Sequence, residues 1–514
     1  MDNQYNCKVK LSELFYCLFF ASLLFAKGIG LYDGQKAFKL ILVGAGICWA
    51  AKMIMTEFSK KELMAVFLIL FLGMIVYRVS GDKGFLLYAM MVTGAKDIPL
   101  KRIFTVGMIT WLLSFGMMFF LTATHLVDSP FKVHEKGGEL IIRWGLGSTH
   151  PNVLHVSYLV LCMFAGYLLD EKMNLKWLLL LFAGNLYVFI YSVSFTGFIA
   201  VSFYLVLCTY WMVRKKISLP EHILIKGGAA FCVLFSMLGP LLIKGRIFEM
   251  INRILNTRWR LSMIYLTKYP YSLFGRRISD IVTYTSTMDC SYVYAYVAYG
   301  LVAFLLLVAG YILIIHRYCR EQKGKELCMI LASLAAGVTE PFLFNTSFKN
   351  IPLLFFRDLL YSGRQDGKRI SFLQKHDKTV IFSSKKFAEA AGRIGSGIRK
   401  TKRRIPVILF LAFAVGAIAY KSCAVPPERI VVPRSESDLD ESWYTELELS
   451  QGQIKEGDIV YGKIEEDTVL LGLKGKAIDW EILRNTVTSG ILTGGMALII
   501  ITIHGYLKGK ENDR

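Results

Sequence analysis

The chain has 514 residues, of which 54% are hydrophobic and 19% charged, and its mean hydropathy is +0.46. This composition excludes a soluble globular enzyme of ordinary make-up and a disordered or collagen-like chain. Sixty Lys and Arg against 39 Asp and Glu give a formal net charge of +21. In so apolar a chain, cytoplasmic loops of a membrane protein explain this excess before nucleic acid does, so we expect no nucleic-acid partner.

Repeated apolar runs, most of them long enough to approach the roughly 20 residues of a full span, predict membrane-spanning helices along most of the chain. In chain order the predicted spans are residues 11–27, 37–54, 63–78, 102–123, 151–169, 176–193, 195–213, 223–243, 291–316 and 327–343. Residues 84–95 and 350–362 are marginal in length and fit re-entrant, tilted or ordinary spans. The first run has no clear cleavage site, so we expect a retained helix. The sequence therefore predicts an all-α polytopic membrane protein with a bundle of about 12 helices.

The short basic loops give the expected orientation of this bundle. Lys and Arg cluster after the second span, before the span at residue 102, and after the runs that end near residues 213 and 316. If residues 84–95 form a span, all these clusters share one side with the N-terminus, and that side should be cytoplasmic. The loops at residues 124–150 and 244–290 then lie outside the cytoplasm.

The C-terminal part of the chain is built differently from this core at residues 1–362. Residues 363–404 carry 13 Lys and Arg against three acidic residues, which predicts a basic cytoplasmic linker. Residues 405–514 contain two further apolar runs, at 405–420 and 487–507. The segment between the runs, residues 421–486, carries 14 acidic against eight basic residues, and its short β-branched stretches predict a small β-rich external module.

The loop at residues 244–290 carries eight Lys and Arg against three acidic residues. A basic loop is not expected outside the cytoplasm. Either the proposed orientation is inverted, or the positive charge serves to bind an anionic ligand. Arg253, Arg258 and Arg260 are the candidates, because the planar guanidinium suits phosphate or pyrophosphate. If residues 251–266 form one interfacial helix, Arg253 and Arg260 share a face and Arg258 points elsewhere. The other arginines are better explained by lipid headgroups: Arg246, Arg276 and Arg277.

Four further polar residues fall on the same predicted side as this loop. His150 and Asn152 flank Pro151 at a predicted helix N-terminus, which favours an anion, although a capping histidine fits equally well. Asp289 precedes the span at residue 291, where simple capping is the alternative. Glu340 lies in an apolar run, where a carboxyl is costly and either faces a site or reaches toward the surface. No metal-ligand spacing is evident, and we expect neither a metal nor another cofactor.

Three motifs together resemble bacterial polysaccharide polymerases of the Wzy kind, a family related to the O-antigen ligases. The stretch from Gly147 to Asn152 is similar to that family's Gly-His-Pro-Asn motif, with Ser-Thr inserted. Residues 255–260 and 269–275 resemble its large external loop. Residues 289–292, ending in Tyr292, resemble its Asp-Asn-Ser-Tyr motif with Cys290 in place of Asn, and Glu340 resembles a late-helix acid of such proteins.

The resemblance covers roughly residues 11–362 and implies a glycosyl transfer at the outer face of the bacterial cytoplasmic membrane. A growing O-antigen, capsule or exopolysaccharide chain on undecaprenyl pyrophosphate would move onto a lipid-linked repeat unit. His150, Asp289 and Glu340 would be catalytic, and Arg253, Arg258, Arg260, Asn152 and Tyr292 would bind substrate. Residues 444–449 of the C-terminal unit resemble chain-length regulators of the same pathways. A chain-length regulator or a flippase would be a partner.

Three rival functions remain at the level of sequence. A ligase would use the same donor with a different acceptor. A flippase or another secondary transporter would also be polytopic and basic, although we find no repeated halves of the kind that transporters often have. A structural assembly protein is the third.

Overall fold

The computed structural model describes most of the chain. The described residues are 6–124, 126–127, 131–136, 139–148, 150–269, 271–277, 288–361, 369–383, 385–399, 402–423, 429–433, 459–465, 468–473 and 476–512. Within them, eleven helices are long and apolar enough to cross a membrane. They are α1 (Leu11–Gly28), α2 (Lys36–Met55), α3 (Lys60–Ser80), α5 (Leu100–Ala123), α6 (Pro151–Leu169), α7 (Leu175–Ser192), α8 (Phe195–Arg214), α9 (Leu219–Met237), the continuous α13 (Ser291–Tyr294), η4 (Ala295–Tyr299) and α14 (Gly300–Arg320), α18 (Ile405–Cys423) and α20 (Lys476–Asn512).

These helices confirm the predicted all-α polytopic class. Large apolar side chains on their outer faces are exposed, such as Leu40, Val43 and Ile47 of α2, each more than 60% accessible. A surface of this kind is stable against lipid tails and not against water. The chain is therefore a multi-pass membrane protein.

The predicted span at residues 327–343 is shorter than expected, and the two runs of marginal length form short or irregular elements. The run at residues 327–343 forms α15 (Gly324–Ala336), which has 13 residues and ends before Glu340. Its end is explained by Pro341, which cannot donate a backbone hydrogen bond and begins the 3₁₀ turn η5 (Pro341–Leu343). The run at 84–95 forms the 11-residue α4 (Gly84–Gly94). The run at 350–362 forms η6 (Ile351–Phe356) and α16 (Arg357–Leu360).

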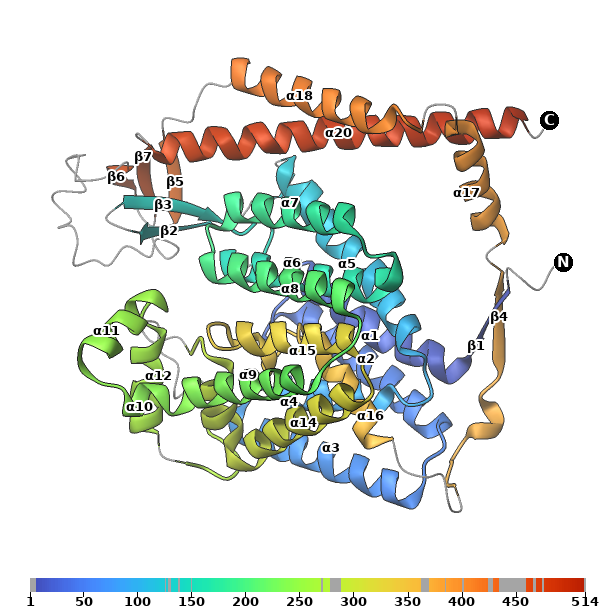
Figure 1. The fold of residues 1–514 in the computed structure, drawn as a ribbon, viewed down its shortest axis with the longest axis vertical. Coiled ribbons are helices and arrows are strands. Elements are labelled where there is room, and N and C mark those ends of the chain that lie inside the picture. Colours follow the sequence, from blue (N-terminus) through green and yellow to red (C-terminus); the bar gives the residue numbers. More distant parts are fainter. Residues whose placement is uncertain are drawn as a thin grey trace.

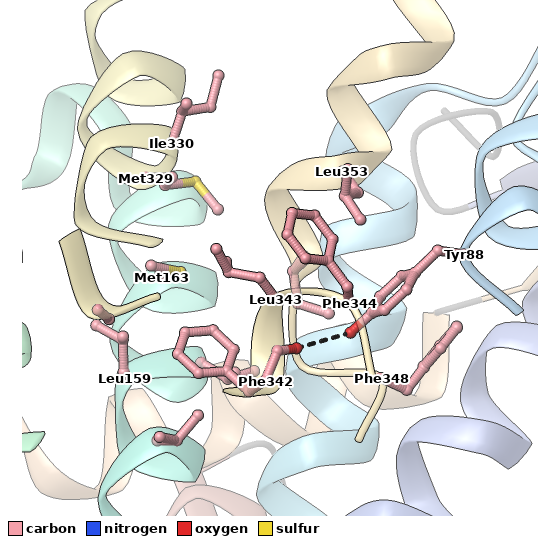
Figure 2. Close-up of a cluster of buried hydrophobic side chains, with 14 of the residues drawn as sticks. Tyr88, Leu159, Met163, Met329, Ile330, Phe342, Leu343, Phe344, Phe348 and Leu353 are labelled. Carbon is pink, nitrogen blue, oxygen red and sulfur yellow. Dashed lines mark hydrogen bonds between the residues drawn. The ribbon is translucent and has the colours of Figure 1, made fainter. Parts of the chain in front are cut away.

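The irregular backbone after α15 lies inside the bundle, where protein and not lipid surrounds it. Figure 2 shows Phe342, Leu343 and Phe344 pointing into a cluster of buried side chains, to which α4, α6 and α15 all contribute. The Tyr88 hydroxyl of α4 donates to the Phe342 carbonyl oxygen at 3.3 Å. Because a buried non-helical backbone needs partners for its polar groups, this packing fixes the positions of Glu340 and Lys349, which flank the cluster.

The elements outside the spans gather at the two ends of the bundle (Figure 1). One end carries the antiparallel hairpin of β2 (Phe131–Lys136) and β3 (Glu139–Trp144), with α10 (Gly239–Leu242), α11 (Gly245–Ile254) and α12 (Arg258–Lys268). The other end carries η2 (Asp170–Lys172), β1 (Asn6–Lys10), η7 (Gln374–His376), β4 (Thr379–Ser383) and α17 (Lys385–Ile398). There β1 pairs antiparallel with β4, so part of the basic segment is tied to the N-terminus.

The expectation of one helix over residues 251–266 is wrong, because α11 and α12 are separate helices. Asn256 and Thr257 between them have φ angles of 50° and 66°, in the left-handed region that interrupts a helix. The two helices consequently turn relative to each other, and the predicted shared face of Arg253 and Arg260 does not form.

The C-terminal unit is a pair of helices with a small sheet. Thr493 of α20 donates to the Ala412 carbonyl oxygen of α18 at 2.9 Å, and a Cβ on Gly416 would meet Thr493, so small residues let the helices approach closely. The antiparallel sheet has the order β5 (Arg429–Pro433), β7 (Thr468–Leu473), β6 (Ile459–Glu465). Helix α20 begins eleven residues before the predicted span. Its 37 residues extend about 55 Å, longer than an apolar bilayer core. Residues 444–449 lie outside the described part of the chain.

Candidate functional site

A buried polar cluster forms around Glu340 at the end of the bundle that carries α12 and the β2–β3 hairpin. Glu340 is 6% exposed and its Oε1 accepts three hydrogen bonds. Asn152 of α6 donates at 3.2 Å, Thr196 of α8 at 3.0 Å, and Arg258 of α12 at 3.3 Å. Residues from the first turns of three helices therefore converge on one carboxylate.

Arg258 links Glu340 to a second carboxylate. Its Nε lies 3.5 Å from Asp289 Oδ2, and its side chain is 7% exposed, against 32% for Asp289. The next residue, Trp259, packs against α9, where the centre of its ring lies 4.7 Å from that of Phe235. This contact holds α12 in place. The arginine is thus fixed between two acids, as in a preorganised electrostatic site.

The surroundings leave Glu340 able to exchange a proton near neutral pH. It lies in the loop beyond α15, outside the spanning helices, and burial raises its pKa to about 7. Arg258, Thr196 and Arg143 lower this pKa, and the charge of Asp289 raises it further. A carboxyl of this kind can serve as a general base or acid.

Besides Thr196, which the sequence analysis did not propose either, two further residues extend the cluster. Arg143 of β3 donates from Nη2 to Asn152 Oδ1 at 2.5 Å and from Nε to the Ser192 carbonyl oxygen at 2.8 Å. His155 of α6 is buried, with Nδ1 2.8 Å from Ser192 Oγ and Nε2 2.8 Å from Asn185 Oδ1. The sequence did carry a signal for both, since each is an ionisable residue inside an apolar stretch.

His150 occupies the N-cap position of α6. Its Nδ1 accepts a hydrogen bond from the Asn152 backbone N–H at 3.1 Å, and Pro151 fills the first helical position. The tautomer with a proton on Nε2 follows from this bond. Capping by His150 orients Asn152, which is the helix's contact with Glu340. Thr149 lies outside the described residues.

The motif at residues 289–292 holds the backbone of the loop that carries Glu340. Ser291 Oγ donates to the Glu340 carbonyl oxygen, and its backbone N–H donates to the Gly337 carbonyl oxygen at 2.9 Å. Tyr292 is 2% exposed and donates to the Leu334 carbonyl oxygen at 2.7 Å. Its ring lines an apolar cavity of about 650 Å³ between α9 and α14, so Tyr292 positions α15 and is not brought to Glu340.

The other two predicted arginines lie away from the cluster. Arg260 pairs with Glu249 of α11 at 2.8 Å, and both side chains are about half exposed. Arg253 is exposed on α11. Of the three arginines proposed from the sequence, the structure brings Arg258 to Glu340 and Asp289.

A second cavity, of about 220 Å³, adjoins Glu340 on the side facing α1 and has both apolar and charged side chains in its wall. It is lined by Lys27 and Asp33, by Val153 of α6, and by the loop that ends in Lys349. No group of three or more His, Cys, Asp or Glu side chains suited to a metal ion occurs within the residues that the structure describes. The polar groups of the site are carboxylates, amides, hydroxyls and basic side chains.

Comparison with known proteins adds no further identification. No protein-family model matches the chain, and searches of curated proteins and of solved structures find no significant match. The fold and the site together define a multi-pass α-helical membrane protein with a buried, charged cluster at one end of its bundle.

Proposed function

We propose that this chain is a polysaccharide polymerase of the bacterial cytoplasmic membrane. The observation that carries the proposal is Glu340, a buried carboxyl with a pKa of about 7 that lies against Arg258 and lines a cavity of about 220 Å³. A membrane protein gains nothing in stability from placing such a group beside a cavity, whereas proton transfer requires it. The motifs around His150 and Asp289 favour glycosyl transfer over other proton-transfer reactions.

In the proposed reaction, a hydroxyl of the lipid-linked repeat unit attacks the anomeric carbon of the growing glycan. The new C–O bond forms as the bond from that carbon to the diphosphate oxygen breaks, and undecaprenyl diphosphate leaves with the bonding electrons. The hydroxyl proton passes to the Glu340 carboxylate and then to water. Asn152 and Arg258 orient Glu340, and Asp289 balances the charge of Arg258.

The test uses the purified full-length chain in vesicles with lipid-linked repeat units, and polymer is resolved as a glycan ladder. We expect Glu340→Gln to remove polymer while the protein still inserts into the membrane and keeps its fold. Glu326→Gln is the matched control, because Glu326 is equally buried (6%) at the opposite end of α15. Transfer to a lipid core or to a protein, without a ladder, would instead indicate a ligase.

We also propose that residues 405–514 set polymer length or recruit a partner of the pathway. The support is that α20 packs on α7 and on β3, the strand that carries Arg143. Deletion of residues 405–514 should change the modal length of the ladder or the association with a partner. An unchanged ladder together with unchanged association would contradict this role.

A further inference from the structure

Two lysines beside the Glu340 cluster have no direct ion pair with an acid in the part of the chain that the structure describes. Lys27 ends α1, and Lys349 follows the buried loop after η5 (Figure 2 shows its neighbour Phe348). Both line the 220 Å³ cavity. Lys349 is 4% exposed and donates a hydrogen bond to the Val153 carbonyl oxygen at 3.3 Å. Within the described ranges neither ammonium group forms an ion pair with a carboxylate.

The acids that line this cavity are already paired elsewhere. Asp33 lies 2.7 Å from Lys83, and Glu340 is held by Arg258. The two lysines therefore repel each other across the cavity, and the acids that attract them, Glu340 for Lys349 and Asp33 for Lys27, are shared with other cations. Burial lowers the pKa of Lys349 to about 7, which means that the fold alone does not keep this amine fully charged.

A buried amine without an anion costs free energy that folding could avoid with an apolar side chain. An anion in the cavity would remove this cost, because it relieves the repulsion and accepts charge-assisted hydrogen bonds from both lysines. Thr346 and Ser347 also line the cavity and add hydroxyl groups suited to phosphate oxygens. The wall is thus built for a compact, oxygen-rich anion.

We infer that the cavity between Lys27 and Lys349 is a binding site for a phosphate-type anion, which the donor's diphosphate would occupy. The assignment to the donor rests on the proposed function, whereas the anion site does not. The site differs from the arginine site expected from the sequence, because Arg258 is committed to two carboxylates and Arg260 to Glu249.

The test measures binding of inorganic pyrophosphate to the full-length chain in phosphatidylcholine nanodiscs by calorimetry. We expect Lys349→Met to weaken binding by about tenfold or more, the loss of one or two charge-assisted hydrogen bonds. Lys349→Arg should retain most of the affinity. Lys325→Met, which breaks the Lys325–Asp170 pair at the far end of the bundle, should leave it unchanged.

Two competition experiments identify the source of the anion. Competition by polyprenyl diphosphate supports the donor, and competition by phosphatidylglycerol in the nanodisc would assign the cavity to a lipid headgroup. Absence of pyrophosphate binding, or equal binding by Lys349→Met, would overturn the inference. If Lys349→Met fails to fold, pyrophosphate binding by Lys27→Met is measured instead, and the same outcomes apply. Because binding is measured without polymer synthesis, failure of the polymerase proposal is recognised separately.

A different set of contacts supports a second inference, about α20. Trp144 follows Arg143 in β3, and its Nε1 donates to Glu481 Oε1 of α20 at 2.7 Å. The Arg484 guanidinium lies 4.3 Å from the centre of the Trp144 ring and is paired with Glu481. One turn further along α20, Thr488 is hydrogen-bonded to the Tyr191 hydroxyl.

Trp144 and Tyr191, which contact α20, are each adjacent in sequence to a member of the polar cluster. Arg143 precedes Trp144, and Ser192, whose carbonyl oxygen accepts from Arg143, follows Tyr191. We propose that α20 is a positioning element, which holds Arg143 and Ser192 and thereby orients Asn152 toward Glu340. The C-terminal unit would then act on the rate of transfer without touching substrate.

Glu481→Leu should increase amide hydrogen exchange in residues 139–148 and lower the maximal rate of polymer formation about ten- to hundredfold, with the KM for donor unchanged. Glu481→Gln keeps a carbonyl acceptor for Trp144 and should restore both. Asp479→Asn, an exposed acid on the same turn, is the control. Unchanged exchange in Glu481→Leu would contradict the positioning role, whatever reaction the protein catalyses.

Discussion

The ion pair between Arg258 and Glu340 gives the sharpest prediction about the cluster. The two side chains are 7% and 8% exposed, with Nη2 and Oε1 3.3 Å apart. At an effective dielectric constant of about 20 their attraction is about 5 kcal/mol, most of which offsets desolvation. Arg258→Met leaves Asp289 and Glu340 without the cation that they share. Because the pKa of Glu340 is about 7 even beside Arg258, Glu340 takes up a proton in the variant at pH 8, and this limits the loss. We therefore expect the free energy of unfolding at pH 8 to fall by about 2–3 kcal/mol.

The assay is unfolding of the purified chain in mixed detergent micelles, followed by tryptophan fluorescence. The double variant Arg258→Met, Glu340→Gln should lose about 1 kcal/mol less than the sum of the single variants, because Gln needs no proton when the cation is absent. Arg260→Met on the same helix breaks the half-exposed pair with Glu249 and should cost at most about 1 kcal/mol. Equal losses from the two arginine variants, or strict additivity in the cycle, would refute the reasoning.

Two further predictions test the site and the fold around it. Because burial raises the pKa of Glu340 to about 7, its carboxylate form accumulates as the pH rises through that value, so the rate of polymer formation should rise between about pH 6 and pH 8. A rate that is flat over this range in vesicles would contradict the assignment of Glu340 as the base. A Cβ on Gly275 would lie 1.9 Å from the Ala298 carbonyl oxygen at a φ of +91°, so Gly275→Ala should lower the free energy of unfolding by about 2 kcal/mol or more. Gly44→Ala, which meets nothing within 4 Å in α2, should raise it by up to about 1 kcal/mol, and the reverse order would be inconsistent with this packing.

The long spans were predictable from the sequence because lipid requires apolar side chains over a fixed length. Their ends depend on tertiary contacts and were less accurate. Helix α20 begins at Lys476 because Glu481 and Arg484, too polar for a predicted span, are held by Trp144. Helix α15 ends at Ala336 because the following segment turns into the core.

The site was predictable in part. Glu340, Asn152 and Arg258 come together because all three lie at the same end of the bundle, Asn152 and Arg258 at helix N-termini and Glu340 after the C-terminus of α15, and the orientation rule indicated this shared side. The contact of Arg143 with Asn152 depends on how the hairpin folds over α6, and no spacing in the sequence encodes it. Lys349 lies in a loop whose burial follows from the packing of Phe342 and its neighbours.

The most direct test of the proposed polymerase is the glycan ladder of cells that lack this chain, beside cells that carry it or its Glu340→Gln variant. The proposal predicts that single repeat units, linked to lipid, collect at the outer face without longer polymer, both in the deletion and in the variant. Lipid-linked units trapped at the cytoplasmic face would contradict it and assign the chain to transport.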